Sequence, residues 1–129
     1  MHRPRCEIPY DYFSFGFIRN PWDRLYSCYR RQRGFKKYLH TSFREYLYTV
    51  GDVGNSAMWF LEGCDYIGKY ETLQASWDDI LDSLDIPKQV IPMLNKYGDS
   101  SYREHYDSQM IDFIREKNAD DIEYGEYTF

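Results

Sequence analysis

The sequence predicts an α/β fold in which a small parallel sheet is accompanied by a mostly helical remainder. Two observations lead to this prediction. Segments of strand length alternate with segments of helical periodicity along the chain. The first strand candidate, residues 12–19, is small or apolar on both of its sides, which suits a strand covered on both faces. The chain has 129 residues, so we expect residues 1–129 to form a single domain.

The first predicted strand leads directly into a helix. Along the strand, one side carries aromatic rings and the other carries small or apolar residues: Phe13, Phe15 and Phe17 alternate with Ser14, Gly16 and Ile18. Asn20 is a good N-cap, and Pro21 is well placed as the first helical residue. We expect this helix to run to about Arg33 and to stop at Gly34.

The middle of the chain predicts two more helices. Ser42 and Glu45 have the spacing of a capping box, which opens a second helix. Its apolar stripe recurs at helical intervals and consists of Phe43, Tyr46, Leu47 and Val50. Gly51 ends this helix, and residues 55–62 are expected to form a short one.

The second half begins with a short strand and a third helix. Residues 65–70 predict the strand, and the helix after it ends before Pro87. One face of that helix is apolar and carries Leu73, Trp77, Ile80, Leu81 and Leu84. Residues 87–104 are expected to be mainly loop, because they contain two prolines and a glycine. The last helix starts near Asp107, and the aromatic tail from Glu123 to Phe129 is expected to dock on the body.

Composition excludes several classes of protein. Aromatic residues make up 19% of the chain, which argues against intrinsic disorder. Three cysteines without close spacing exclude a disulfide scaffold and a structural zinc site, and we expect no metal. No apolar run is long enough for a membrane span, and no signal peptide is visible. These features predict a cytoplasmic location.

Charge is divided unevenly along the chain. Residues 1–50 hold 10 Lys or Arg and 4 Asp or Glu, whereas residues 51–129 hold 6 and 17. The basic half indicates either a solvated helix face or an anion site. Nucleic acid is a weaker alternative, because the whole chain carries a net charge of −5 and shows no nucleic-acid-binding signature.

The first strand-to-helix junction is the best candidate for chemistry. Arg19 lies at the carboxyl end of a predicted parallel strand, where ligands of open α/β sheets collect. The helix that follows directs free N–H groups to the same place, and Ser27 lies one to two turns into it. An Arg fork and a hydroxyl together suit a phosphate monoester. In the alternative, Arg19 pairs with Asp23 and Ser27 is an ordinary surface residue.

The junction resembles a known family. The stretch FGFIRNPWDRLYSCYRR is similar to the 3′-phosphate-binding segment of sulfotransferases, particularly the carbohydrate-type enzymes and their small bacterial relatives. Three later segments also resemble the family, in the same order: residues 65–73 (DYIGKYETL), residues 94–96 with 102–107, and residues 121–129. The resemblance implies the P-loop-NTPase-like sulfotransferase fold over nearly the whole chain.

The resemblance also implies a reaction and a set of site residues. Sulfotransferases move a sulfuryl group from 3′-phosphoadenosine 5′-phosphosulfate to a hydroxyl, here expected to belong to a carbohydrate, without a metal. By position, Arg19 and Ser27 hold the 3′-phosphate. Arg103 closes over the nucleotide from a C-terminal loop, unless it makes an ordinary contact with Glu104. The catalytic residue stays unassigned, because His105 is more simply explained as an exposed histidine.

One part of the family pattern is missing. The family has an upstream loop that cradles the 5′-phosphosulfate, and the 18 residues before Arg19 contain no such loop. We therefore expect the C-terminal portion of a sulfotransferase, truncated at its N-terminal side. The alternative function is a catalytically inactive remnant, or a module that binds a nucleotide or another protein. An incomplete sheet edge is expected to favour association with another chain.

Overall fold

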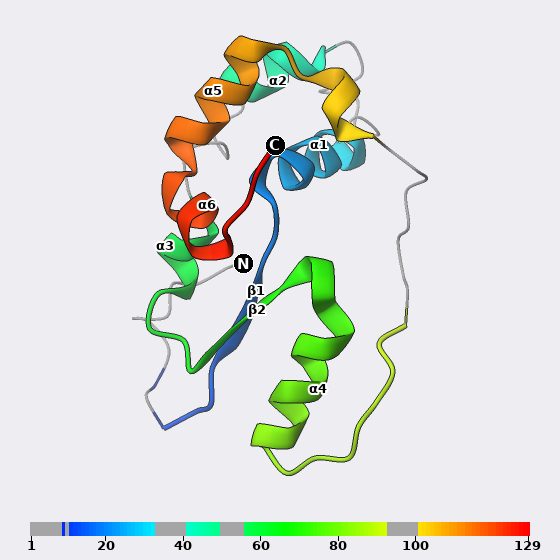
Figure 1. Ribbon diagram of the computed structural model, residues 1–129, viewed down its shortest axis with the longest axis vertical. Coiled ribbons are helices and arrows are strands. Elements are labelled where there is room, and N and C mark those ends of the chain that lie inside the picture. The colour runs from blue at the N-terminus through cyan, green and yellow to red at the C-terminus, as the bar shows by residue number, and fades with distance from the viewer. Residues whose placement is uncertain (1–8, 10, 33–40, 50–55, 93–100) are drawn as a thin grey trace. The chain divides into compact units, whose positions relative to one another are not determined.

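A computed structural model describes residues 9, 11–32, 41–49, 56–92 and 101–129 (Figure 1). The chain divides into two compact units, each built from two segments: Met1–Arg19 with Ala57–Lys96, and Asn20–Ser56 with Tyr97–Phe129. The first unit holds the sheet, and the described residues of the second unit form helices but no strand. The described fold is therefore α/β with a small parallel sheet and a mostly helical remainder, as predicted. The single domain and the finer sulfotransferase fold stay predictions.

The predicted elements are present, with two differences. The elements of the first unit are β1 (Phe15–Ile18), α3 (Ala57–Leu61), β2 (Tyr66–Lys69), the 3₁₀ turn η4 (Tyr70–Thr72) and α4 (Leu73–Ser83). Those of the second are α1 (Pro21–Gln32), α2 (Phe43–Thr49), the 3₁₀ turn η5 (Tyr102–His105), α5 (Ser108–Lys117) and α6 (Ala119–Gly125). The segment expected to be loop thus contains η5, and the last helix is divided in two at Asn118. Residues 33–34 and 51, the predicted stops of α1 and α2, lie outside the described residues.

The two strands of the first unit pair in parallel. Phe15 lies opposite Tyr66, and the pairing continues to Ile18. Just before the strands, the backbone N–H and the hydroxyl of Ser14 both donate to Asp65 Oδ2 at 2.8 Å. The N–H of Asp65 donates back to Ser14 Oγ at 3.2 Å. This reciprocal contact fixes the register, because a shift of one residue would separate both partners.

Two glycines allow helices to cover the two faces of this strand pair. Neighbouring residues of a strand point to opposite faces, so Gly16 faces one side while Phe17 and its pairing partner Gly68 face the other. A Cβ atom on Gly16 would lie 2.2 Å from Leu61 Cδ2 of α3. One on Gly68 would lie 2.6 Å from Ser76 Cβ of α4. The strands are therefore sandwiched between α3 and α4, which is the layered arrangement expected from the sequence (Figure 1).

We expect Gly68→Ala to destabilise the chain by about 1–3 kcal/mol, because the added methyl overlaps Ser76 in a packed interface. Chemical denaturation measures the loss. The second variant Gly68→Ala/Ser76→Gly removes the overlapping atoms and should recover part of the stability. Equal losses in both variants would show that the contact with α4 is not the cause.

The predicted helix starts of the second unit are confirmed. Asn20 Oδ1 accepts the N–H groups two and three residues later, at 3.1 and 3.4 Å, and Pro21 is the first residue of α1. Ser42 and Glu45 form the capping box, since each backbone N–H donates to the other side chain, at 3.0 and 3.2 Å. The side chain of Asp107 caps α5. These local contacts satisfy N–H groups that a helix start leaves without backbone partners.

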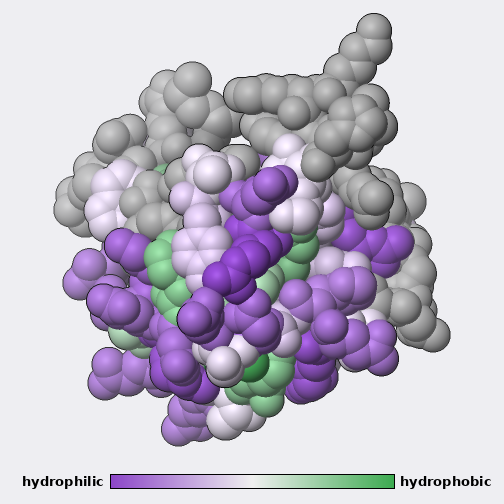
Figure 2. Space-filling view, turned by 90° about the horizontal axis from the view of Figure 1, so that it is seen from above, coloured by the Kyte–Doolittle hydropathy of each residue, from purple (hydrophilic) through white to green (hydrophobic). Residues whose placement is uncertain are grey.

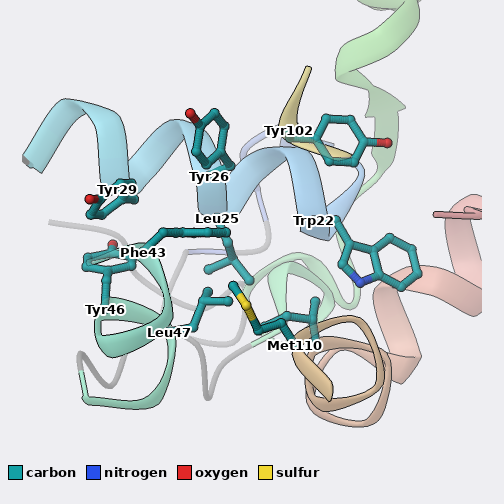
Figure 3. Close-up of a cluster of buried hydrophobic side chains, with 10 residues drawn as sticks. Trp22, Leu25, Tyr26, Tyr29, Phe43, Tyr46, Leu47, Tyr102 and Met110 are labelled. Atoms are coloured by element: carbon teal, nitrogen blue, oxygen red, sulfur yellow. The ribbon is translucent and has the colours of Figure 1, made fainter. Parts of the chain in front are cut away.

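An aromatic core holds the second unit together (Figure 3). It draws side chains from α1, α2, η5 and α5: Trp22, Leu25, Tyr26, Tyr29, Phe43, Tyr46, Leu47, Tyr102, Met110 and Ile114. The predicted docking of the tail is confirmed, because the ring of Phe129 lies 5.5 to 5.8 Å from those of Trp22, Tyr102 and Tyr106. On the face shown in Figure 2, the described surface is mostly hydrophilic.

The phenol of Tyr106 also supports α1. Its hydroxyl donates to the backbone carbonyl of Trp22 at 2.7 Å. Burial raises the pKa of Tyr106, and the charge of Asp23 raises it further. The phenol therefore stays neutral at physiological pH and keeps the proton that this hydrogen bond requires.

A buried polar cluster joins α1 to α6. Arg24 Nη2 donates to Asn118 Oδ1 at 2.7 Å, and Arg24 Nη1 lies 3.3 Å from Asp121 Oδ2. Both Asn118 and Asp121 are fully buried. Arg24 belongs to the basic stretch in which the sequence indicated a solvated face or an anion site, but here its charge is compensated inside the protein.

We expect Asp121→Ala to cost about 3–5 kcal/mol, because it leaves the Arg24 guanidinium largely buried without its counter-charge. Asp120→Ala is the matched control: it removes a carboxylate from the neighbouring exposed position and should change stability by less than about 0.5 kcal/mol. Thermal and denaturant unfolding of both variants give the comparison. A loss of similar size in the control would assign the effect to net charge.

Candidate functional site

The carboxyl ends of β1 and β2 form the candidate site. Ile18 lies opposite Lys69 in the parallel register, so the residues that follow, Arg19 and Tyr70, leave the sheet at the same edge. Arg19 therefore lies where open parallel sheets hold their ligands, with the ring of Tyr70 beside it. Tyr70 was not singled out from the sequence, because its place beside Arg19 depends on the strand register.

Arg19 is positioned by an aromatic ring. Its Cζ atom lies 4.4 Å from the centroid of the Tyr70 ring, and its side chain is only partly exposed. A guanidinium over an aromatic face gains roughly 0.5–2 kcal/mol, and the contact restricts its orientation. The planar fork still suits two oxygens of one phosphate, because guanidinium N–H groups lie in the plane of the fork.

The Tyr70 ring also lines a pocket in the first unit. The cavity has a volume of about 520 Å³, which falls in the range of small-molecule sites. Its walls come from β1, η4, α4 and the segment after α4: Phe17, Tyr70, Leu73, Trp77, Gln89, Val90, Ile91 and Pro92. Nearly all of the exposed lining is apolar, and three of the side chains are aromatic. The pocket therefore suits a flat apolar group whose polar substituents lie toward Arg19.

One side chain fastens the outer wall of the pocket. The amide of Gln74, on α4, donates to the Gln89 carbonyl at 3.0 Å and accepts from the Ile91 N–H at 2.9 Å. These two hydrogen bonds tie an extended segment, which has no helix or strand of its own, to a rigid helix. The pocket thus depends on a polar contact between residues far apart in the sequence.

We expect Gln74→Leu to release the wall segment, because it removes both hydrogen bonds while keeping a side chain of similar size. Hydrogen exchange at the Ile91 amide should accelerate by about fivefold or more, since each lost bond is worth roughly 1 kcal/mol. Gln89→Leu is the matched control, because only the backbone of Gln89 makes the contact. Unchanged exchange in Gln74→Leu would show that other contacts hold the wall.

The other predicted site residues lie in the second unit. Ser27 is a partly exposed residue in the second turn of α1. Arg103 is exposed on η5, with its Cζ 4.7 Å from the centroid of the Tyr102 ring. The described unit at the strand edge therefore contains Arg19 but neither of these two residues. His105 is exposed, as expected, and stacks on Tyr26 with ring centroids 4.4 Å apart.

The described residues, and these alone, bear on two further kinds of feature, a cluster of metal-binding side chains and a membrane-spanning helix. No group of three or more His, Cys, Asp or Glu side chains among them is arranged to hold a metal ion. None of the helices in the described part of the chain is both long and apolar enough to cross a membrane.

Comparison with known proteins adds one relative. A protein from Archaeoglobus fulgidus, described only as uncharacterized, is 28% identical over 101 residues, which cover 72% of this chain and 84% of that protein. No family model matches the chain, and no solved structure matches it significantly. The resemblance to sulfotransferases therefore rests on the sequence motifs, and the family assignment stays a prediction.

Proposed function

We propose that this chain is the nucleotide-binding part of a sulfotransferase. It binds 3′-phosphoadenosine 5′-phosphosulfate and serves the transfer of its sulfuryl group to a hydroxyl, with a carbohydrate as the acceptor. The observation that carries the proposal is the place of Arg19. Arg19 directly follows β1, one of two parallel strands, and its guanidinium lies over the ring of Tyr70. Tyr70 in turn lines an apolar pocket.

The chemistry of the donor fits these groups. An adenine nucleotide combines a flat base with anionic phosphates, and the pocket offers aromatic walls beside a guanidinium. Ring stacking contributes roughly 0.5–1.5 kcal/mol beyond burial. Hydrogen bonds to a charged phosphate contribute roughly 1.5–3 kcal/mol. Arg19 would hold the 3′-phosphate, and the proposal keeps for Ser27 and Arg103 the roles that the resemblance implies.

The proposed reaction uses this binding indirectly. An oxygen of the acceptor attacks sulfur, the bond from sulfur to the 5′-phosphate oxygen breaks with its electron pair, and the acceptor loses its proton to a base. The 3′-phosphate takes no part in these bond changes. Arg19 therefore acts by orienting the donor, so that binding energy from a remote group supports the reacting geometry.

A second candidate is a module that binds the nucleotide without transferring sulfuryl. The described groups at the strand edge favour binding, because they are a guanidinium and a pocket with aromatic walls. Binding and transfer are separate observables, so one set of variants distinguishes the two candidates.

We expect the chain to bind adenosine 3′,5′-bisphosphate more tightly than AMP, and Arg19→Ala to weaken bisphosphate binding by roughly ten- to a hundredfold. Isothermal titration calorimetry measures both affinities. Lys88→Ala is the matched control, because Lys88 is an exposed cation of the same unit that pairs with Asp82. It should leave the preference unchanged.

Three outcomes decide between the candidates. Preference for the bisphosphate together with transfer of labelled sulfate from the donor supports the enzyme. The same preference without transfer supports the binding module. If the folded chain binds neither nucleotide, or if Lys88→Ala weakens binding as much as Arg19→Ala does, the proposed site is wrong.

A further inference from the structure

The backbone N–H and C=O groups of β1 point alternately toward β2 and toward the opposite, outer edge of the strand. The N–H of Tyr66 donates to the carbonyl of Ser14 at 3.2 Å, so the backbone polar groups of Ser14 point toward β2. These directions alternate along a strand, and those of Phe15 and Phe17 consequently point to the opposite edge. Among the described residues, β1 pairs with no strand other than β2.

The same edge carries an exposed aromatic row. Phe13 is 39% exposed and Phe15 is 42% exposed, although both are large apolar side chains. Their rings form a continuous series, because the Phe15 ring lies 6.4 Å from Phe13, 6.2 Å from Phe17 and 5.9 Å from Trp77. Residues 12–18 contain no charged side chain. Strand edges of soluble proteins are normally protected by charges, prolines or a covering element.

We propose that a second copy of this chain pairs with the outer edge of β1, antiparallel and about a two-fold axis at Phe15. Each Phe15 then lies opposite its own counterpart, and Phe13 lies opposite the second copy's Phe17. The residues whose backbone N–H and C=O groups point to this edge form the hydrogen-bonded pairs of the new antiparallel ladder. The result is a four-stranded sheet in the order β2–β1–β1–β2.

A second copy of the chain is the expected partner, because the outer edge of β1 is complementary to itself. A two-fold interface requires that a surface fit its own copy, and the row Phe13, Phe15, Phe17 is symmetric about its middle member. Every cross-strand pair on that face is therefore aromatic with aromatic, which is a favourable combination. Asp11 lies in a turn before β1. When pairing extends the ladder to this residue, Asp11 of each copy lies opposite Arg19 of the other, and opposite charges meet at both ends of the paired segment.

Sheet stability favours the same arrangement. Two strands alone are marginal, and they are stabilised by packing against helices or by further strands. Helices α3 and α4 already cover the faces of β1 and β2, and a second copy would add strands at the edge. Pairing would also remove the exposed edge and reduce the exposure of Phe13 and Phe15. The inference uses only the geometry of β1 and does not depend on nucleotide binding.

Charge reversal tests the register. Sedimentation equilibrium should show a monomer–dimer equilibrium for the unaltered chain. Asp11→Arg and Arg19→Asp should each weaken dimerisation by roughly tenfold, because each places like charges opposite one another at both ends. The double variant Asp11→Arg/Arg19→Asp restores opposite charges and should recover the original dimerisation constant. The readout is association, so it is independent of any nucleotide site.

Disulfide formation tests the position of the axis. Opposed residues of a hydrogen-bonded pair have Cα atoms about 5.5 Å apart, which a disulfide can span. With the three native cysteines replaced by serine, Phe15→Cys should form a covalent dimer on oxidation. Phe13→Cys is the matched control, because its own copy would lie about four residues away along the strand, beyond the reach of a disulfide.

The proposal is overturned by any of three results. One is a monomer at every concentration. Another is a dimerisation constant that neither single charge reversal changes, or that the double variant fails to bring back to the original value. The third is crosslinking of Phe13→Cys as fast as Phe15→Cys. If Phe15→Cys does not fold, the charge-reversal series decides the question, because both of its positions are at least partly exposed.

Discussion

The parallel pairing of β1 with β2 is the constraint on which the first unit depends. Two four-residue strands offer few backbone hydrogen bonds, so their register needs help from side chains. Ser14 and Asp65 supply it at one end, and Gly16 and Gly68 let α3 and α4 cover the two faces. With this register fixed, Arg19 and Tyr70 meet at the other end. The candidate site is thus a consequence of strand pairing.

Local signals made much of the fold predictable. The cap at Asn20, the capping box at Ser42 and the aromatic alternation of residues 12–19 each act over a few residues, and all appear in the structure. The sequence did not reveal the division between α5 and α6, because no proline or glycine marks it. The fully buried Asn118 lies at that point and bonds to Arg24, 94 residues earlier. A contact between residues so far apart in the sequence produces no periodic pattern from which it could be predicted.

The candidate site was predictable only in part, for the same reason. Strand-to-helix chemistry identified Arg19, and the apolar face of α4 included Trp77, which lines the pocket. The pocket itself depends on Gln74, whose amide holds a segment 15–17 residues away. A glutamine on an exposed helix position is common, and nothing in its neighbours shows that its amide supports a binding wall. Ser27 was proposed from the same junction and from the family resemblance, and Arg103 from the resemblance alone. Strand geometry tests neither residue.

Arg19 connects the two proposals physically. In one it holds a phosphate, and in the other it lies opposite Asp11 of a second copy. A guanidinium has donors enough for two partners, but a phosphate and a carboxylate beside the same cation repel each other. A bound nucleotide would therefore weaken the charge pairing at the ends of the dimer, and dimerisation would weaken nucleotide binding by the same factor, because coupling between two equilibria is reciprocal. The aromatic row centred on Phe15 lies outside this competition, so the coupling would be limited to the contribution of the two end pairs.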